Sequence, residues 1–400
     1  MSGESPLSMM RPAGPGRRKP AAGSTGRRRL RLALVGAGIV VVLGLGWIWL
    51  WYYAASVADR SLAGWVDREA AAGRVYGCAS QTIGGFPLRI EARCASAVAE
   101  IKNTQPPLTL KAEQVIFSAQ VFRPTMLTGD ISGPVLLAES GQSPRFVANW
   151  ARARVSVHGR PPYPDQVSFL LEAPRLDRGG GSGEMIFEAK HADLQTRIVG
   201  GTARDNPVID TALHLGAATA PTLHPLLAEP IEAEIETVLR GFKDLAPKPW
   251  ADRFREMQAA GGGIEIKSLR LTRSDAIIVG SGTLTVNAHG KLDGLIRVAI
   301  VGIERIVPLL GVDRMIERGV DRLTGTDGAS TQGLGALDRL VPGLGGAIRD
   351  TANASLIDNL KKMGQSAEID KKPAIVLPLR FSDGAIYLGM LRLGEAPPLF

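Results

Sequence analysis

The sequence LALVGAGIVVVLGLGWIWLWYYA, residues 32–54, contains no charged residue and determines how the rest of the chain is organised. A helix needs roughly 20 apolar residues to cross the ~30 Å hydrocarbon core of a bilayer, and this stretch is long enough. In lipid, every backbone polar group must be hydrogen-bonded within the protein, and a single helix meets this requirement. The stretch therefore predicts one transmembrane helix close to the start of the sequence.

The residues that flank this stretch predict its orientation. Basic residues precede it, and aromatic residues crowd its C-terminal end. The basic residues are Arg17, Arg18, Lys19, Arg27, Arg28, Arg29 and Arg31, and the aromatic residues are Trp47, Trp49, Trp51, Tyr52 and Tyr53. Positive charge stays on the cytoplasmic side, and Trp and Tyr favour the headgroup layer. We therefore expect a single-pass membrane anchor with a cytoplasmic N-terminus and an exported body.

A cleaved secretory signal is the alternative to an anchor, because Ser56-Val57-Ala58 looks like a cleavage site. The apolar core of a signal peptide is usually about 7–15 residues long, which is shorter than this stretch. The length therefore favours an uncleaved anchor. With either outcome, we expect the chain after about residue 59 to be exported.

The positive charge of the chain is concentrated at its start. Eight of the 47 Lys and Arg residues lie in residues 1–31, with only one of the 39 Asp and Glu residues, so the remainder is nearly neutral. A nucleic-acid-binding protein needs a basic body, and we therefore expect no nucleic-acid partner. Residues 1–31 are rich in Pro, Gly, Ser and Arg and predict a disordered cytoplasmic arm suited to anionic lipid headgroups.

Two cysteines, Cys78 and Cys94, are the only ones in the chain. An even number of cysteines in an exported protein favours a disulfide. Gly84 and Gly85 provide a turn between them, and a hairpin around this turn would bring the two thiols close together. A metal pair or a redox dithiol is the alternative, but no histidine is nearby and no C-x-x-C motif occurs. The pattern predicts a structural disulfide.

Charged residues alternate with apolar ones in the strand expected after this turn. Arg89, Glu91 and Arg93 would share one face, opposite Ile90 and Ala92. Such a face is typical of a solvated surface with cross-strand pairing. A small basic site for an anionic headgroup or a partner is the alternative.

The remaining chain is predicted to be α+β and β-rich: an elongated antiparallel-sheet periplasmic body with interspersed helices, behind the single N-terminal transmembrane helix. Period-two spacing of apolar residues predicts strands, and helical spacing predicts helices. The expected segments are a stalk helix over 55–75, a first β-rich segment over 76–220, a helical segment over 221–262, a β-meander over 263–302, and helices with a closing hairpin over 303–400.

Three local features support these segments. A switch of apolar parity at Trp150-Ala151 predicts a β-bulge. Within the helical segment, Ile231, Ile235 and Leu239 recur at helical spacing. In the last segment, we expect helices near 312–323 and 350–362 and a hairpin that turns at residues 383–384.

The sequence contains no recognisable catalytic motif. The five histidines are scattered, no G-x-S-x-G elbow occurs, and the glycine run at 179–183 lacks the Gly-Lys-Ser/Thr of a phosphate-binding loop. We therefore predict no catalytic residues, no metal site and no cofactor, and a protein that is not an enzyme. Catalytic groups can converge from distant positions, so a hydrolase is retained as a third alternative.

Two stretches resemble the domain of unknown function 2125 family of Gram-negative bacteria. They are the pattern Cys…GGFPLRIEARC after the anchor, with Cys78, Gly85, Phe86, Pro87, Arg89 and Cys94, and the closing LPLRFSDGAIYLGMLRLGEAPPL. The resemblance covers about residue 32 to the C-terminus and brings no known activity. It marks Gly85, Phe86, Pro87 and Arg89 as a possible binding motif.

The stretch GTLTVNAHGKLDGLIRVAIVGI is more broadly similar to the AsmA-like superfamily. That likeness implies one inner-membrane helix and a periplasmic β-rich groove associated with lipid movement or outer-membrane biogenesis, and it carries no functional residues. The first expectation is a sheet whose apolar groove binds lipid or another amphiphile in envelope biogenesis. The alternative is a structural component of the cell envelope that binds a protein partner and no small molecule.

Overall fold

The computed structural model describes residues 25–160, 163–179, 183–246, 248–307, 344–389 and 391–400. The chain divides into two units, Met1–Ala54 and Ala55–Phe400, and we refer to the second as the body. Helix α1 (Thr25–Ala71) begins in the first unit and ends in the body. Its apolar part is long and apolar enough to span a membrane, and side chains such as Val40 are 69% exposed.

One continuous helix replaces the separate stalk helix expected over residues 55–75. The structure has no break in α1 after the apolar stretch, and the helix continues to Ala71. Gly73 follows with a φ of 79°, a left-handed conformation that glycine adopts without strain and that commonly ends helices. Gly73 therefore ends a helix that begins much earlier than the expected stalk.

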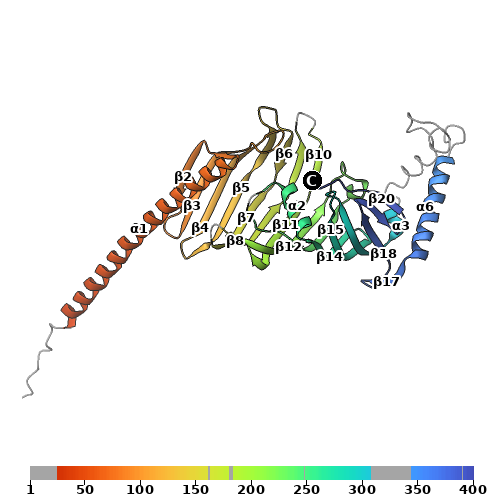
Figure 1. Cartoon of the computed structure of the whole chain (residues 1–400). Helices are drawn as coiled ribbons and strands as arrows, with labels where there is room; N and C mark the ends of the chain where they lie inside the picture. Colours follow the sequence, from red (N-terminus) through yellow and green to blue (C-terminus); the bar gives the residue numbers. More distant parts are fainter. Residues whose placement is uncertain (1–24, 161–162, 180–182, 247, 308–343, 390) are drawn as a thin grey trace, which may run out of the picture. The chain divides into compact units, whose positions relative to one another are not determined.

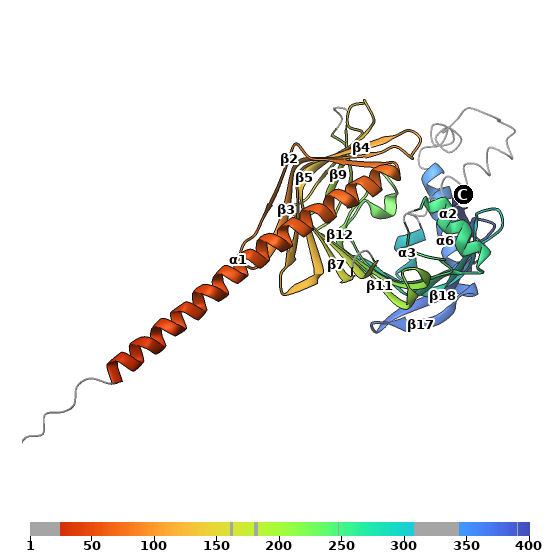
Figure 2. The ribbon, with the colours of Figure 1, turned by 60° about the vertical axis from the view of Figure 1, so that its left-hand side comes forward.

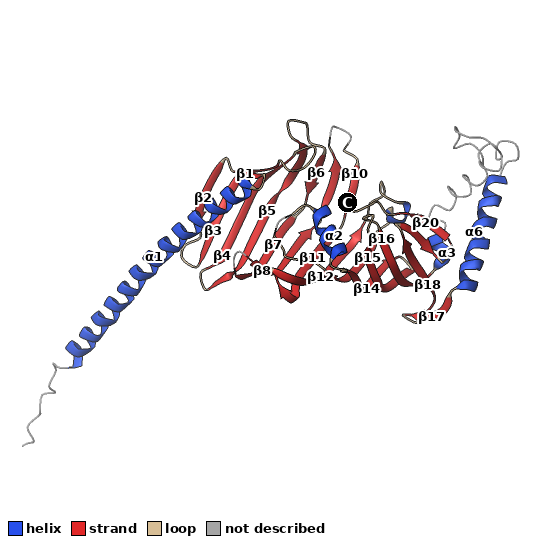
Figure 3. Cartoon of the chain, in the orientation of Figure 1, coloured by secondary structure: helices blue, strands red, loops and turns tan. Residues whose placement is uncertain are grey.

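The body consists mainly of strands, as Figure 1 and Figure 3 show. Its first strands are β1 (Arg74–Gly77), β2 (Ser80–Gly84), β3 (Arg89–Ile101), β4 (Leu108–Gln120), β5 (Arg123–Glu139), β6 (Phe146–Asn149), β7 (Arg152–Arg160), β8 (Tyr163–Glu172), β9 (Arg175–Arg178), β10 (Met185–Glu188), β11 (His191–Thr202) and β12 (Asp205–Ala218). The later strands are β13 (Ile231–Arg240), β14 (Gly263–Arg273), β15 (Ala276–Val286), β16 (Leu292–Val301), β17 (Gln365–Ile369), β18 (Lys372–Ser382), β19 (Ala385–Leu388) and β20 (Leu391–Glu395). Within the described residues, the helical elements after α1 are η1 (Pro225–Leu227), α2 (Trp250–Ala259), α3 (Ile303–Ile306) and α6 (Leu344–Met363).

All the strands belong to one antiparallel sheet. Its main path runs β3, β4, β5, β7, β8, β11, β12, β13, β14, β15, β16 and β18, with each strand paired to the next. Strands β1 and β2 pair with β3, while β6, β9 and β10 form a branch from β5. The prediction of a β-rich chain with one N-terminal apolar helix and a large antiparallel sheet is confirmed.

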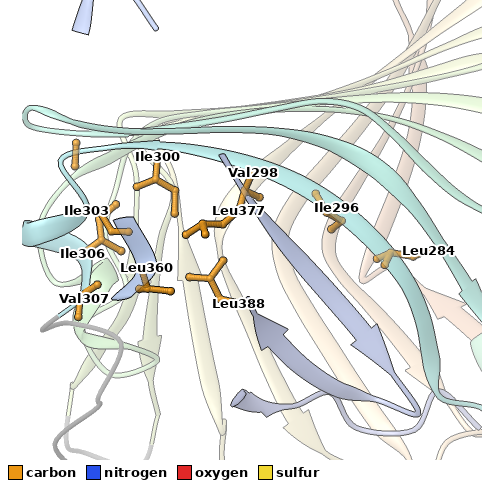
Figure 4. Close-up of a cluster of buried hydrophobic side chains, with 11 residues drawn as sticks. Leu284, Ile296, Val298, Ile300, Ile303, Ile306, Val307, Leu360, Leu377 and Leu388 are labelled. Atoms are coloured by element: carbon orange, nitrogen blue, oxygen red, sulfur yellow. The ribbon is translucent and has the colours of Figure 1, made fainter. Parts of the chain in front are cut away.

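The main core of the body lies at the C-terminal end of this sheet. Side chains from β15, β16, β18 and β19 pack against α3 and α6 on the concave side of the strands, as Figure 4 shows. The labelled members of this cluster are Leu284, Ile296, Val298, Ile300, Ile303, Ile306, Val307, Leu360, Leu377 and Leu388. A smaller cluster of Phe242, Met257 and Val286 attaches α2 to the same sheet.

The helical segment expected over residues 221–262 is wrong for most of its length. Residues Ile231–Arg240 form strand β13, which pairs with β12 and β14 along its length. In this strand Ile231, Ala233 and Ile235 alternate with three glutamates, and this period-two pattern fits a sheet with one apolar face. The helical spacing is coincidental, because Ile231, Ile235 and Leu239 are four residues apart, and this spacing fits both a helix face and one face of a strand. Helix α2 is the part of the prediction that remains.

Other local expectations differ in detail. At Trp150-Ala151 the structure has a break between β6 and β7 rather than a bulge within one strand, and these strands pair with different neighbours, β9 and β8. The Trp150 indole Nε1 donates to the carbonyl oxygen of Ile131, 2.7 Å away, and this bond fixes the break. The helix expected over 312–323 lies outside the described residues, and the one near 350–362 belongs to α6.

A disulfide joins Cys78 to Cys94, whose Cα atoms are 5.3 Å apart, and links the start of the body to β3. We expect the double substitution Cys78→Ser, Cys94→Ser to lower the free energy of unfolding by about 3 kcal/mol, because a closed loop of this length restricts the unfolded chain. Denaturant unfolding of the full chain in detergent measures the change. Reducing agent should shift the wild-type curve equally and leave the double variant unaffected. An unchanged midpoint in the variant would show that the bridge contributes no stability.

Candidate functional site

The strand pairings place thirteen residues in one row across the sheet. Residues directly opposite each other in a pair point to the same face, so the row can be followed strand by strand. It consists of Ile83, Ala92, Phe117, Gly129, Val155, Phe169, Leu194, Leu213, Ile235, Leu269, Gly280, Val298 and Leu377. With about 4.8 Å between strands, it extends over roughly 55–60 Å. No member is polar, and we call this set the apolar row.

Exposure changes along the apolar row. Val298 and Leu377 are 4% and 1% exposed, because they lie in the core beneath α3 and α6. Phe117 and Phe169 are 39% and 42% exposed, and Leu127 in the adjacent row of the same face is 40% exposed. The row therefore has a closed half, built like a protein core, and an open half, from β4 to β12, where apolar side chains remain accessible.

The opposite face of the same strands is charged. The residue next to each member of the apolar row points the other way and belongs to a second row: Arg93, Ile116, Asp130, Arg154, Leu170, Asp193, His214, Glu234 and Arg270. Arg154 donates from Nε to Asp130, 2.8 Å away, which raises the pKa of Arg154. The charged face is therefore suited to water, and the two faces of the open half differ sharply in chemistry.

The concave side of the sheet is the apolar one. Figure 2 shows α3 on the inside of the curve made by the strands, and the residues of α3 pack in the same cluster as Val298 and Leu377. The open half of the apolar row belongs to this same face. Its accessible side chains therefore continue the surface that α3 and α6 cover further along.

A cavity of about 230 Å³ lies beside the apolar row. Strands β8, β11 and β12 contribute Val167, Thr196 and Thr211, and the other wall includes Phe242 and Trp250. Sites for drug-sized ligands usually measure roughly 300–1,000 Å³. This cavity is smaller, and its size suits the end of an apolar chain rather than a whole amphiphile.

An ionic cluster holds the wall of this cavity in place. The Arg253 guanidinium, in a residue only 8% exposed, lies 3.3 Å from Asp244 and 3.2 Å from Glu256, and it also donates to the carbonyl oxygens of Asp244 and Ala246. Lys248 hydrogen-bonds to both carboxylates and lowers the pKa of Asp244 and of Glu256. Every charge in the cluster has an opposite partner, and its arrangement fixes α2 to the preceding loop.

This cluster predicts an effect of acid on α2. A carboxyl with a lowered folded pKa stabilises the fold above its unfolded pKa of about 4, and the contribution is lost as pH falls through the folded value. We expect hydrogen exchange in α2, corrected for the intrinsic rate, to accelerate below about pH 4, while β16 stays protected. Lys248→Met should weaken protection of α2 already at pH 7. Equal protection of α2 at pH 6 and pH 3 would contradict this assignment.

The motif residues selected from the sequence lie in the loop between β2 and β3 and at the first position of β3. Gly85 has a φ of 97°, and a Cβ there would come within 2.7 Å of the Arg89 carbonyl oxygen, so the tight turn needs glycine. Phe86 is 51% exposed, and Pro87 follows it in a cis peptide bond. Arg89 Nε lies 2.7 Å from Glu91. Gly85, Phe86 and Pro87 therefore lie in one loop at the end of β2, and Arg89 is the first residue of β3.

The face with Arg89, Glu91 and Arg93 is not uniformly solvated. Glu91 is 5% exposed and accepts from both arginines, each 2.7 Å away, while the arginine side chains are more than half exposed. These two ion pairs join residues two apart on one strand. Glu91 lies between Arg89 and Arg93 along β3, opposite Gly84 on β2 and Ser118 on β4.

Comparison with known proteins gives one family. Residues 51–397 match the family described as an uncharacterized protein conserved in bacteria, DUF2125. The chain belongs to the DUF2125 family. This membership confirms the resemblance seen in the sequence and covers nearly all of the body. No curated protein matches the chain.

The predicted membrane-interface residues of this DUF2125 chain all lie on α1. Trp49 stacks on Tyr53 with ring centroids 5.8 Å apart, and Trp51 makes an edge contact with Tyr52 at 5.2 Å. Trp47 lies one turn before Trp51 on the same helix. Within the described residues, no three His, Cys, Asp or Glu side chains come together as possible metal ligands. The apolar row could not be named from the sequence, because its members become neighbours only through the strand register.

Proposed function

We propose that this protein is anchored in the inner membrane by α1 and that its body, on the periplasmic side, binds lipid or another amphiphile along the open half of the apolar row. The supporting observation is the continuity of that row. Phe117 and Phe169 stand in register with Val298 and Leu377, which are core residues under α3 and α6. An apolar chain on the open half would occupy the place that helices occupy on the closed half.

The energetics favour an apolar ligand. Covering exposed apolar surface contributes about 25 cal/mol per Å², and phenylalanine side chains are among the largest contributors. Accessible apolar residues of the open half lie on neighbouring strands rather than scattered singly, and such contiguous patches mark binding sites. The charged opposite face favours water, so the body would contact an amphiphile on one side only. The cavity beside Trp250 would accept the end of the chain.

The proposed role is binding or guidance in envelope biogenesis and involves no catalysis. Where ion pairs or hydrogen bonds shift the pKa of a carboxyl group in the described residues, they lower it, as Asp210 between Arg197 and Lys267 illustrates, so none of these groups is poised as a general acid. These groups are kept ionised. A general acid, by contrast, needs a raised pKa.

Photo-crosslinking in the full-length chain tests the proposal. A benzophenone amino acid placed at position 169 should form adducts with membrane lipid or another amphiphile in intact cells. Position 295 provides a matched control, since Leu295 is also 42% exposed but faces the charged side, next to the buried Ile296. Adducts at 169 and not at 295 support the proposal. Protein adducts at 169 would instead favour a structural or protein-interaction role, and equal lipid labelling at both positions would contradict a specific site.

A further inference from the structure

Two neighbouring loops at one end of the sheet expose large apolar side chains. The first, between β2 and β3, carries Phe86 and Leu88, which are 51% and 57% exposed. The second, between β4 and β5, carries Phe122, which is 70% exposed. The Val121 amide donates to the carbonyl oxygen of Leu88, 3.1 Å away, so the loops lie side by side. We call Phe86, Leu88 and Phe122, together with the arginines beside them, the rim.

The rim is positively charged. Arg89 and Arg93 have side chains that are 60% and 52% exposed, and both pair with the buried carboxylate of Glu91. Arg123 is exposed next to Phe122. Exposed aromatic and aliphatic groups beside arginines match the interfacial layer of an anionic bilayer, where apolar side chains enter the headgroup boundary and basic groups contact the headgroups.

The chain enters the body at this same end of the sheet. Within the body, α1 runs beside β1 and β2: the Trp65 ring stacks on Tyr76 at 4.9 Å, and Asp59 accepts a hydrogen bond from Gln81 at 3.0 Å. Going backward along α1, the contacts move forward along β1 and β2, toward the first rim loop. Ala55 lies about one helical turn, some 6 Å, before Asp59. The first residue of the body is therefore close to the rim, and the apolar stretch of α1 precedes it directly in the chain.

We propose that the rim is a membrane-contacting surface: Phe86, Leu88 and Phe122 enter the headgroup boundary of the anionic bilayer that holds α1, and Arg89 and Arg123 contact its headgroups. This inference rests on the proposed anchoring. The lipid surface would then touch the end of the sheet where β3 begins and β4 ends, and Phe117 of the open half lies three residues before the end of β4. Contact there would give an amphiphile a short route between the bilayer and that row.

Crosslinking of the full-length chain in nanodiscs tests this surface. The discs contain phosphatidylethanolamine and phosphatidylglycerol, and a benzophenone amino acid replaces one residue at a time. The rim is probed at Phe86 and Phe122, and the anchor at Val40. Leu223, 66% exposed, is the matched control because it lies between β12 and β13, at the opposite end of the strands. If one of the two rim substitutions prevents folding, the other still tests the rim.

Lipid adducts at positions 40, 86 and 122 but not at 223 would support the rim. Adducts at 40 alone would overturn the rim and leave the anchor intact. No adduct at 40 would overturn the anchoring itself, and similar yields at 86, 122 and 223 would show unspecific contact and overturn the rim. In discs of phosphatidylcholine alone, the rim yields should fall at least about threefold, while the yield at 40 stays unchanged. Unchanged rim yields would overturn the role of the arginines.

Discussion

Replacing Leu377 with alanine is expected to lower the free energy of unfolding by about 3 kcal/mol, within the 2–5 kcal/mol that such core truncations cost. Leu377 is 1% exposed and lies in the closed half of the apolar row, in the cluster formed with α3 and α6. Removing its isobutyl group leaves a cavity that well-packed neighbours such as Val298 and Leu360 fill only in part. Denaturant unfolding of the full-length chain in detergent measures the change.

The same substitution in the open half provides the control. Leu127 lies on the same face but is 40% exposed, so Leu127→Ala should cost less than about 1.5 kcal/mol. The difference between the two leucines tests the division of this face into a closed and an open half. Equal losses at both positions would mean that the open half is packed like the core, and the proposed binding surface would then not exist.

Phe169→Asp is expected to remove the bound amphiphile while leaving the body folded. A carboxylate in the middle of the open half would have to be desolvated under an apolar chain, which costs several kcal/mol. We expect at least about a tenfold loss of tightly bound amphiphile, equivalent to about 1.4 kcal/mol or more. Organic extraction of the purified full-length chain, with quantification per mole of protein, measures the loss. Because Phe169 is 42% exposed without a ligand, the unfolding midpoint should change little.

Leu295→Asp is the matched control for this variant. It places the same carboxylate at an equally exposed leucine on the charged face, near Arg380 and Arg297. The amount of extracted amphiphile should equal that of the wild type, including lipid associated with α1. If Phe169→Asp and Leu295→Asp lose amphiphile equally, the effect does not come from the apolar row.

Local patterns in the sequence predict much of this architecture. Residues 263–302 alternate as β14, β15 and β16 do, and the glycines between Cys78 and Cys94 predict the hairpin that brings the cysteines together. Uncharged residues from Leu32 onward predict the apolar helix. These features depend on neighbours a few residues apart, and such short-range physics can be read from one sequence.

The remaining features depend on contacts between distant residues. The sequence predicts a helix at β13 because the spacing of its isoleucines fits both a helix face and a strand face. Only pairing with β12 and β14 selects the strand. Glu91 is buried while Arg93, on the same face of β3 and also between β2 and β4, has a side chain that is 52% exposed, and the spacing of charges in the sequence does not reveal this difference. Phe169 and Leu377 both lie in strands whose apolar residues alternate with others. Phe169 is exposed and Leu377 is buried because α3 and α6 pack only on the part of the sheet that contains Leu377.

Native mass spectrometry of the full-length wild-type chain, released from mild detergent, tests the central claim most directly. Collisional activation removes lipids that surround a membrane helix loosely, and a ligand held in the open half should survive longer. The proposed function predicts a stoichiometric adduct on each chain, identified by fragmentation as phospholipid or another amphiphile. A bare protein mass under conditions that keep the Cys78–Cys94 bridge and the fold intact would contradict it.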